Sequence, residues 1–95
     1  MRTIERDISW TSAFKRDFKR EKKKDRQLEN ALDPVLSLLV NDESLPPKYV
    51  DHALTGDWKN NRDCHIKPDL ILIYQKPDDE TLLLIRLGTH SELGI

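Results

Sequence analysis

The apolar positions of this chain occur in blocks, and their spacing changes from helical to extended about halfway along the sequence. The first block contains Phe14 and Phe18, four residues apart, with charged residues between them. Because residues three or four apart share one face of a helix, this pattern predicts an amphipathic helix that runs to about Lys24. The side-chain oxygen of Thr11 or Ser12 can cap the N-terminus of this helix.

A second helical pattern begins after Asp25 and places five apolar residues on one side. Pro34 interrupts it, because a proline inside a helix loses a backbone hydrogen bond and clashes with the preceding turn, at a cost of about 3 kcal/mol. Either the helix kinks at Pro34, or Asp33 caps a new segment in which Pro34 is the first residue. The five apolar residues are Leu28, Leu32, Val35, Leu36 and Leu39.

Extended segments are predicted on both sides of the two helices. Residues 3–9 alternate loosely, so we expect Ile4 and Ile8 to face the core from a first strand. Farther along, residues 57–59 and 62–66 are predicted to be the two arms of a hairpin, because the intervening Asn-Asn pair is a turn signal.

The last third of the chain predicts the centre of the sheet. Residues 70–74 are an uninterrupted apolar run, too short for an independent helix, which favours a central strand buried on both faces. A Pro-Asp-Asp turn follows, and residues 81–87 are the expected partner strand. The order β-α-α-β-β-β-β predicts an α+β fold, with two N-terminal helices packed on a small twisted, mainly antiparallel sheet in a single domain over residues 1–95.

The charged residues change this picture through their distribution. The chain has a net charge of −1, yet residues 15–26 hold eight basic residues against three acidic ones, a local charge of +5. Because salt screens exposed charges beyond about 10 Å, such a block can attract a polyanion even when the whole protein is nearly neutral. A solvated helix face is the alternative interpretation. The basic residues are Lys15, Arg16, Lys19, Arg20, Lys22, Lys23, Lys24 and Arg26.

Two further features bear on the compartment. No segment approaches the roughly 20 apolar residues needed to cross a bilayer, and the first seven residues lack the apolar run of a signal peptide. The single cysteine, Cys64, excludes an internal disulfide. We therefore expect a cytoplasmic protein without membrane association, in which Cys64 is placed more naturally in the core than as a nucleophile.

The three histidines lie where strands are predicted to begin or end. His52 is in the loop that enters the sheet, and His65 and Asp69 flank a Lys67-Pro68 turn that holds the two groups on one side. His90 follows the last strand. Because antiparallel neighbours share an edge of the sheet, we expect these side chains to converge.

Imidazoles grouped with a carboxylate suit proton transfer, since histidine titrates near neutral pH. RNA carries its own nucleophile in the 2′-hydroxyl, so its cleavage needs only a base, an acid and cations that stabilise the phosphorane charge. Arg86 and Lys67 are candidates for those cations, together with a protonated histidine. This chemistry requires no metal or other cofactor.

A zinc site is an alternative interpretation of the same residues. Against it, Cys64 and His65 are adjacent and would point to opposite faces of a strand, and no Cys-x-x-Cys pair occurs. Trp58 and Tyr74 could stack on bases, although Tyr74 lies among apolar neighbours and is expected in the core. The zinc ligands would come from His52, Cys64, His65, Asp69 and His90.

Four ordered segments in the second half of the chain resemble one toxin family. They are Asp-His-Ala-Leu-Thr-Gly at 51–56, Trp-Lys at 58–59, His-Ile-Lys-Pro-Asp at 65–69 and Gly-Thr-His at 88–90. Together they resemble the YafQ-type toxins of the RelE/ParE superfamily. The resemblance implies a ribosome-dependent mRNA endonuclease, the toxin of a type II toxin–antitoxin system, whose partners are an antitoxin, mRNA and the ribosome.

The same resemblance implies roles for individual residues. His90 corresponds to the main catalytic histidine, expected to act as general acid toward the leaving oxygen. One of His52 and His65 is expected to be the general base, and Asp69 to orient or raise the basicity of a neighbour. Arg86 corresponds to a basic residue that faces the scissile phosphate. The basic block is then left to contact ribosomal RNA.

Two other functions stay open at this point. A relative that has lost RNA cleavage, or that acts on DNA gyrase, would share the fold, although gyrase-directed relatives generally lack this histidine set. A plain interaction domain would leave the histidines scattered. Widely separated rings of His52, His65 and His90 would therefore end the catalytic interpretation.

Overall fold

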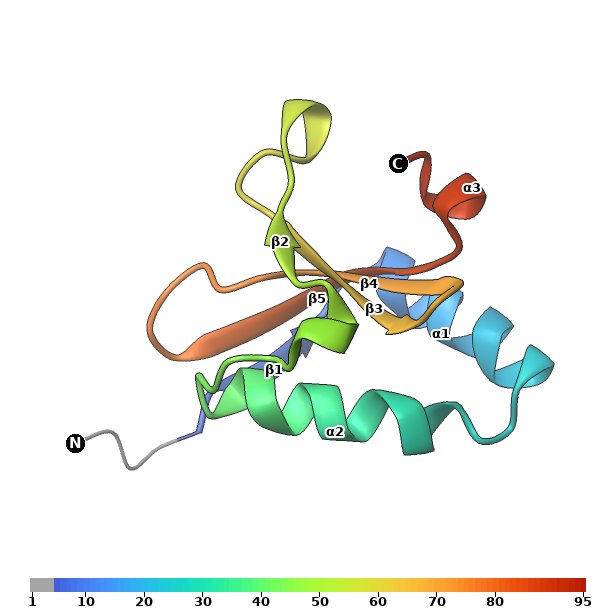
Figure 1. The fold of residues 1–95 in the computed structure, drawn as a ribbon, viewed down its shortest axis with the longest axis horizontal. Coiled ribbons are helices and arrows are strands. Elements are labelled where there is room, and N and C mark those ends of the chain that lie inside the picture. The colour runs from blue at the N-terminus through green and yellow to red at the C-terminus, as the bar shows by residue number, and fades with distance from the viewer. Residues whose placement is uncertain (1–4) are drawn as a thin grey trace.

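The structure, a computed structural model, describes residues 5–95 and consists of two helices packed against a five-stranded sheet (Figure 1). The α+β fold, with two N-terminal helices on a mainly antiparallel sheet, is confirmed. Within residues 5–95, no helix is both long and apolar enough to span a membrane. The main elements are β1 (Asp7–Trp10), α1 (Ser12–Lys24), α2 (Leu28–Val40), β2 (His52–Ala53), β3 (Arg62–Lys67), β4 (Leu70–Gln75), β5 (Thr81–Gly88) and α3 (His90–Leu93).

Helix α1 has the predicted bounds. Thr11 is its N-cap, and the side-chain oxygen of Thr11 accepts a hydrogen bond from the backbone N–H of Phe14 at 2.9 Å. Trp10 lies against two aromatic rings of α1, with its ring centroid 5.4 Å from that of Phe14 and 5.8 Å from that of Phe18. These contacts attach the apolar face of α1 to the end of β1.

Helix α2 runs without interruption through Pro34. Asp33 caps no new segment, so that alternative is wrong, and both residues lie on the exposed side. The opposite side buries Leu32, Val35 and Leu39. Burial of each aliphatic side chain contributes about 1.5–3 kcal/mol, which together exceeds the cost of an interior proline.

The sheet has the order β1-β5-β4-β3-β2. β1 runs parallel to β5, whereas the other neighbouring pairs are antiparallel, as the prediction of a mainly antiparallel sheet requires. β4 lies at the centre, and its residues 70–74 are all buried. The expected partner strand at residues 81–87 is confirmed as β5, which extends one residue farther.

The sheet separates two apolar clusters. The larger one packs α1 and α2 against one face and includes Cys64 and Tyr74, which are core residues as predicted. The smaller one lies on the other face and contains Ile71, Ile73 and Leu93. Figure 1 shows α2 below the sheet, and α3 together with the loop after β2 on its upper side.

The first strand differs from its prediction. It begins at Asp7, and Ile8 is 42% exposed, so the expectation that Ile8 faces the core is wrong. β1 is an edge strand with a neighbouring strand on one side only, and all four of its residues are exposed. Ile4 lies outside the described residues.

The predicted hairpin arm at residues 57–59 is also wrong. Gly56–Trp58 forms a single 3₁₀ turn, η2, and the left-handed φ angles of Gly56 (65°) and Asn60 (75°) turn the chain on either side of it. β3 pairs instead with β2, so His52 lies in a short strand rather than in the loop that enters the sheet. A second 3₁₀ turn, η1 (Pro47–Tyr49), precedes β2.

Helix α3 is an element that we did not predict. Thr89 and Glu92 form a capping box, in which the Glu92 N–H donates to Thr89 Oγ1 at 3.2 Å and the Thr89 N–H donates to Glu92 Oε1 at 2.9 Å. Gly94 ends the helix at a left-handed φ of 72°. Four residues show no periodicity, but the Thr-x-x-Glu spacing is the sequence signal for this helix start.

Candidate active site

Asp63 is a buried carboxylate on β3, and its residue is only 3% exposed. The register of β2 and β3 places His52 opposite it, with His52 Nδ1 3.0 Å from Asp63 Oδ1. This distance allows an ion pair when His52 is protonated, and within residues 5–95 no group donates a hydrogen bond to Asp63 Oδ1. Burial raises the pKa of Asp63, although the charges of His52, His65 and His90 act to lower it.

The ring of His52 has a defined tautomer. Nδ1 lies 2.9 Å from the backbone carbonyl oxygen of Val50, which can only accept a hydrogen bond. Nδ1 must therefore carry a hydrogen in the neutral ring. Nε2 then has the free lone pair, and the side chain is 52% exposed, so a substrate can reach it.

His65 and His90 add two imidazoles to this place. His65 follows Asp63 by two residues on β3, so both side chains lie on the same face of the strand. His90 is the first residue of α3, and its ring centroid is 5.5 Å from that of His65, with the planes at 71°. The three histidines are therefore close together, as the sequence predicts, and are not scattered.

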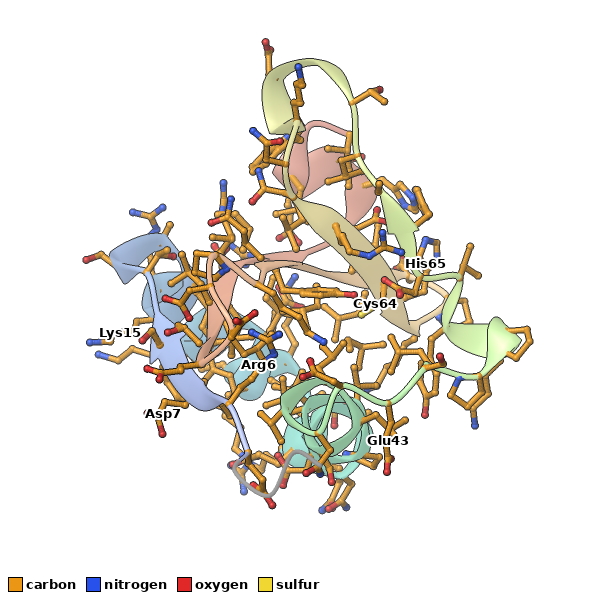
Figure 2. The ribbon with its side chains drawn as sticks, turned by 90° about the vertical axis from the view of Figure 1, so that its left-hand side faces the viewer. Arg6, Asp7, Lys15, Glu43, Cys64 and His65 are labelled. Atoms are coloured by element: carbon orange, nitrogen blue, oxygen red, sulfur yellow. The ribbon has the colours of Figure 1, made fainter. Side chains whose placement is uncertain are left out.

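Sequence reasoning missed Asp63. A signal was present, because Asp63 and His65 alternate at strand spacing with the buried Cys64 and Ile66. Figure 2 shows Cys64 directed into the interior and His65 on the outer side of β3. The place of Asp63 opposite His52 follows from the pairing of β3 with β2, whereas the sequence predicts residues 57–59 as the partner of this strand.

Asp69 is not joined to the imidazoles. It is exposed after β3 and lines a depression with Lys67 and Thr89. Within residues 5–95, no hydrogen bond or ion pair joins it to a histidine. Lys67 Nζ forms an ion pair with Asp25, and its hydrogen bond lowers the pKa of Asp25. The turn therefore places Asp69 and Lys67 beside α1 rather than beside His52.

Arg86 is held by a fully buried carboxylate of α1. Asp17 accepts hydrogen bonds from Arg86 Nε at 2.6 Å and from the Leu87 backbone N–H at 3.0 Å. Burial acts to raise the pKa of Asp17, but these hydrogen bonds and the charges of Arg86 and Arg20 hold it below its ordinary value. Arg86 thus has a fixed orientation at the end of β5.

The basic residues of α1 divide into two groups. Figure 2 shows Lys15 projecting from α1 into solvent. Lys15, Arg16, Lys19 and Lys23 are exposed, line one groove and form no ion pair with the described part of the chain. Arg20, Lys22 and Lys24 instead pair with acidic residues of α1, α2 and the C-terminal segment.

A groove adjoins His65 on the side of η1. Tyr49, Val50 and Pro68 contribute its apolar wall, and Lys48 and Lys67 contribute cations. Lys48 Nζ lies 5.1 Å from the centroid of the Tyr49 ring. An aromatic ring beside two cations is a combination that binds nucleotides in single-stranded RNA.

Cys64 is unsuited to chemistry. It is fully buried, and burial raises the pKa of its thiol. Cys64 and His65 lie on opposite faces of β3, so they cannot share the zinc site considered as an alternative. Within residues 5–95, no three His, Cys, Asp or Glu residues are placed to hold one metal ion together.

The fold is that of bacterial toxins of type II toxin–antitoxin systems. Residues 6–94 match the YafQ family, described as bacterial toxins of such systems. The chain belongs to the YafQ family, and the resemblance seen in its sequence motifs is confirmed.

Individual relatives agree with this assignment. The mRNA interferase toxin YafQ of Escherichia coli strain K12 is 42% identical over 91 residues, which cover 95% of this chain and 97% of that protein. The E. coli DinJ-YafQ complex contains a chain with a TM-score of 0.82 and 40% identity, covering 94% of this chain and 98% of that one. A metal-bound toxin from Helicobacter pylori has a TM-score of 0.84 and 42% identity, covering 95% and 99%.

Proposed function

We propose that this chain is a ribosome-dependent endoribonuclease that cleaves mRNA by metal-independent acid–base catalysis. The observation that supports this most is the grouping of three imidazoles around the buried carboxylate of Asp63. The name mRNA interferase, carried by its E. coli relative, agrees with it. Imidazole is the side-chain group best suited to serve as both acid and base in such a reaction.

The proposed reaction uses the 2′-hydroxyl of the substrate as the nucleophile. A base takes the 2′ proton while the 2′ oxygen forms a bond to phosphorus. The bond from phosphorus to the 5′ oxygen then breaks, and an acid protonates that oxygen. The products are an upstream fragment with a 2′,3′-cyclic phosphate, or its opened form, and a downstream fragment with a 5′-hydroxyl.

His52 fits the role of the base. Its Nδ1–H donates to Val50, so Nε2 has the free lone pair that accepts the 2′ proton. The imidazolium that forms lies 3.0 Å from Asp63 Oδ1, and the opposite charges stabilise it. This choice between His52 and His65 is one that the sequence leaves open.

His90 fits the role of the acid toward the 5′ oxygen. It is exposed on α3, and its ring packs against that of His65. In this role His90 donates its proton to the 5′ oxygen as the bond from that oxygen to phosphorus breaks.

The remaining predicted residues contact the substrate around this centre. We propose that Arg86 stabilises charge on the phosphate and that Asp69 and Lys67 contact the substrate at the β3–β4 turn. The groove at Tyr49 receives a neighbouring nucleotide. The exposed basic residues of α1 bind ribosomal RNA.

An antitoxin is the proposed protein partner. The E. coli relative was solved in a complex with DinJ, and similarity to that complex covers 94% of this chain. A bound antitoxin that covers the imidazole group would prevent RNA from reaching His52. Ribosome-directed action places the protein in the cytoplasm.

The test is cleavage of a defined mRNA on programmed ribosomes, with DNA supercoiling by gyrase measured in parallel. His90→Ala should abolish cleavage, and Ser91→Ala, its exposed neighbour on α3, should leave cleavage unchanged. Ribosomes need Mg²⁺, so 1,10-phenanthroline is the chelator of choice, and cleavage should continue in its presence. Full activity of His90→Ala, or inhibition of gyrase instead of cleavage, would contradict the proposal.

A further inference from the structure

Helix α3 is attached to α1 through the carboxylate of Glu92. One oxygen, Oε1, accepts the Thr89 backbone N–H at 2.9 Å and so caps α3. The other, Oε2, lies 3.2 Å from Arg20 Nε and 3.3 Å from Lys24 Nζ. A single carboxylate therefore holds the first turn of α3 and ties it to two cations of α1.

Arg20 extends this contact to the end of β5. Its Nη2 donates to the carbonyl oxygen of Leu87 at 2.9 Å, and its Nη1 donates to Asp17 Oδ1 at 3.0 Å. Its Nε donates to Glu21 at 2.9 Å, so the guanidinium joins α1 and the end of β5 through hydrogen bonds, and α3 through its ion pair with Glu92. With its side chain 34% exposed and its donors in use, Arg20 differs from the exposed cations of the same helix.

Gly88 leaves the space that this arrangement needs. A Cβ atom at Gly88 would lie 2.9 Å from Arg20 Nη2 and 3.1 Å from Glu92 Oε1, closer than side chains normally approach. Gly88 therefore lies where the guanidinium of Arg20 and the carboxylate of Glu92 meet, and it leaves room for both groups. A side chain at position 88 would therefore require the ends of Arg20 and Glu92 to move apart.

α3 depends on such an attachment because it has only four residues. A helix this short is not stable alone in water, because the free-energy cost of nucleation exceeds the stabilisation that one hydrogen-bonded turn provides. The buried Leu93 and the ion pairs of Glu92 with Arg20 and Lys24 connect α3 to the rest of the fold. These contacts fix the place of His90, whose ring lies against that of His65.

We propose that Arg20 and Glu92 are positioning residues, which fix α3 so that His90 stays against His65, and that Arg20 does not bind RNA. The proposal rests on the proposed function, in which His90 donates the proton. Lys24 contributes to the same contact from the solvent side. Arg20 was expected from sequence among the cations that contact RNA.

The experiment compares Glu92→Gln and Arg20→Gln with Lys19→Gln, which removes a cation of α1 that forms no ion pair within residues 5–95. Glu92→Gln keeps an oxygen for the Thr89 N–H and loses the charge. We expect both test variants to lower kcat by about tenfold to a hundredfold with KM unchanged, because small displacements of a reacting group cost this much. Lys19→Gln should raise KM and leave kcat unchanged, and Arg20→Lys should recover part of kcat.

Hydrogen exchange provides a readout that does not depend on catalysis. The Gly94 N–H donates to the His90 carbonyl oxygen at 2.9 Å and reports whether α3 is formed. Its exchange should be about tenfold faster in Glu92→Gln and Arg20→Gln, and unchanged in Lys19→Gln, with all three proteins folded by near-ultraviolet circular dichroism.

Unchanged exchange in the two test variants would overturn the proposal, and so would a raised KM with unchanged kcat in Arg20→Gln, which is the result for an RNA contact. Faster exchange with an unchanged kcat would also overturn the positioning role. Failure of the proposed function has a different signature, since His90→Ala would then cleave mRNA as well as the unaltered protein does.

Discussion

Replacing Asp63 with asparagine tests the account of the imidazole group, because the substitution removes one charge and keeps the shape of the side chain. In the proposed reaction, Asp63 stabilises the imidazolium of His52 across 3.0 Å. Asp63→Asn should therefore lower kcat and leave KM almost unchanged, since the stabilising charge pair is complete only after His52 takes the proton.

The size of the effect follows from the distance and the exposure. Two unit charges 3.0 Å apart attract by about 1.4 kcal/mol in bulk water, and the attraction rises to about 5.5 kcal/mol at an effective dielectric constant of 20. The His52 side chain is 52% exposed, so the smaller value is the better guide. It corresponds to a loss of about tenfold in kcat.

The same substitution should stabilise the fold. Burial raises the pKa of Asp63 above its ordinary 3.8, so the folded state binds a proton there more readily than the unfolded state does. The stability that Asp63 contributes is complete below pH 3.8 and is lost as the pH rises through the folded pKa. At pH 7, Asp63→Asn should gain about 1 kcal/mol, since a buried charged oxygen without a hydrogen-bond donor is removed.

Single-turnover cleavage on ribosomes gives the rate, and urea unfolding at pH 7 and pH 3 gives the free energy of unfolding. Lower kcat together with higher stability at pH 7, and equal stability at pH 3, is the expected pattern. A variant that is less stable at pH 7, or one with full kcat, would refute the reasoning about His52 and its neighbour.

Three further predictions concern residues outside this group. Asp17→Asn should lower the free energy of unfolding by about 3 kcal/mol at pH 7, because the buried ion pair with Arg86 is broken. The pKa of Asp17 is lowered in the fold, so the loss measured by urea unfolding should shrink as the pH falls below 3.8. A loss that is the same at every pH would contradict this. Pro34→Ala should raise the thermal midpoint through a gain of at least about 1 kcal/mol, since α2 regains a hydrogen bond; a lower midpoint would show that the proline is favourable there. The double variant Lys15→Gln with Lys19→Gln should reduce the slope of log K for RNA binding against log salt concentration by about 1.4. An unchanged slope would show that these two cations do not contact the RNA.

The parts of the fold that sequence could predict are those with strong periodicity. Phe14 and Phe18 mark the face of α1, and the run at residues 70–74 marks a strand buried on both faces. β2 could not be found in this way, because a two-residue strand shows no alternation. Its pairing with β3 is decided by the turns at Gly56 and Asn60, which depend on backbone angles.

Strand pairing also limits which residues of the site can be predicted from the sequence. Histidine stands out in a sequence by its chemistry, so His52, His65 and His90 were found from residue type and from motif. Asp63 was not, since one aspartate among many carries no signal until the partner strand is known. Arg20 likewise counts as one cation in a basic block until Glu92 is seen beside it.

The central claim is that the 2′-hydroxyl of the RNA is the nucleophile, and the ends of the cleaved mRNA test it most directly. Mass spectrometry of the fragments from programmed ribosomes should find a 2′,3′-cyclic phosphate, or its opened form, on the upstream piece and a 5′-hydroxyl on the downstream piece. A 3′-hydroxyl upstream with a 5′-phosphate downstream would mean that water attacks the phosphorus, and it would contradict the roles proposed for His52 and His90.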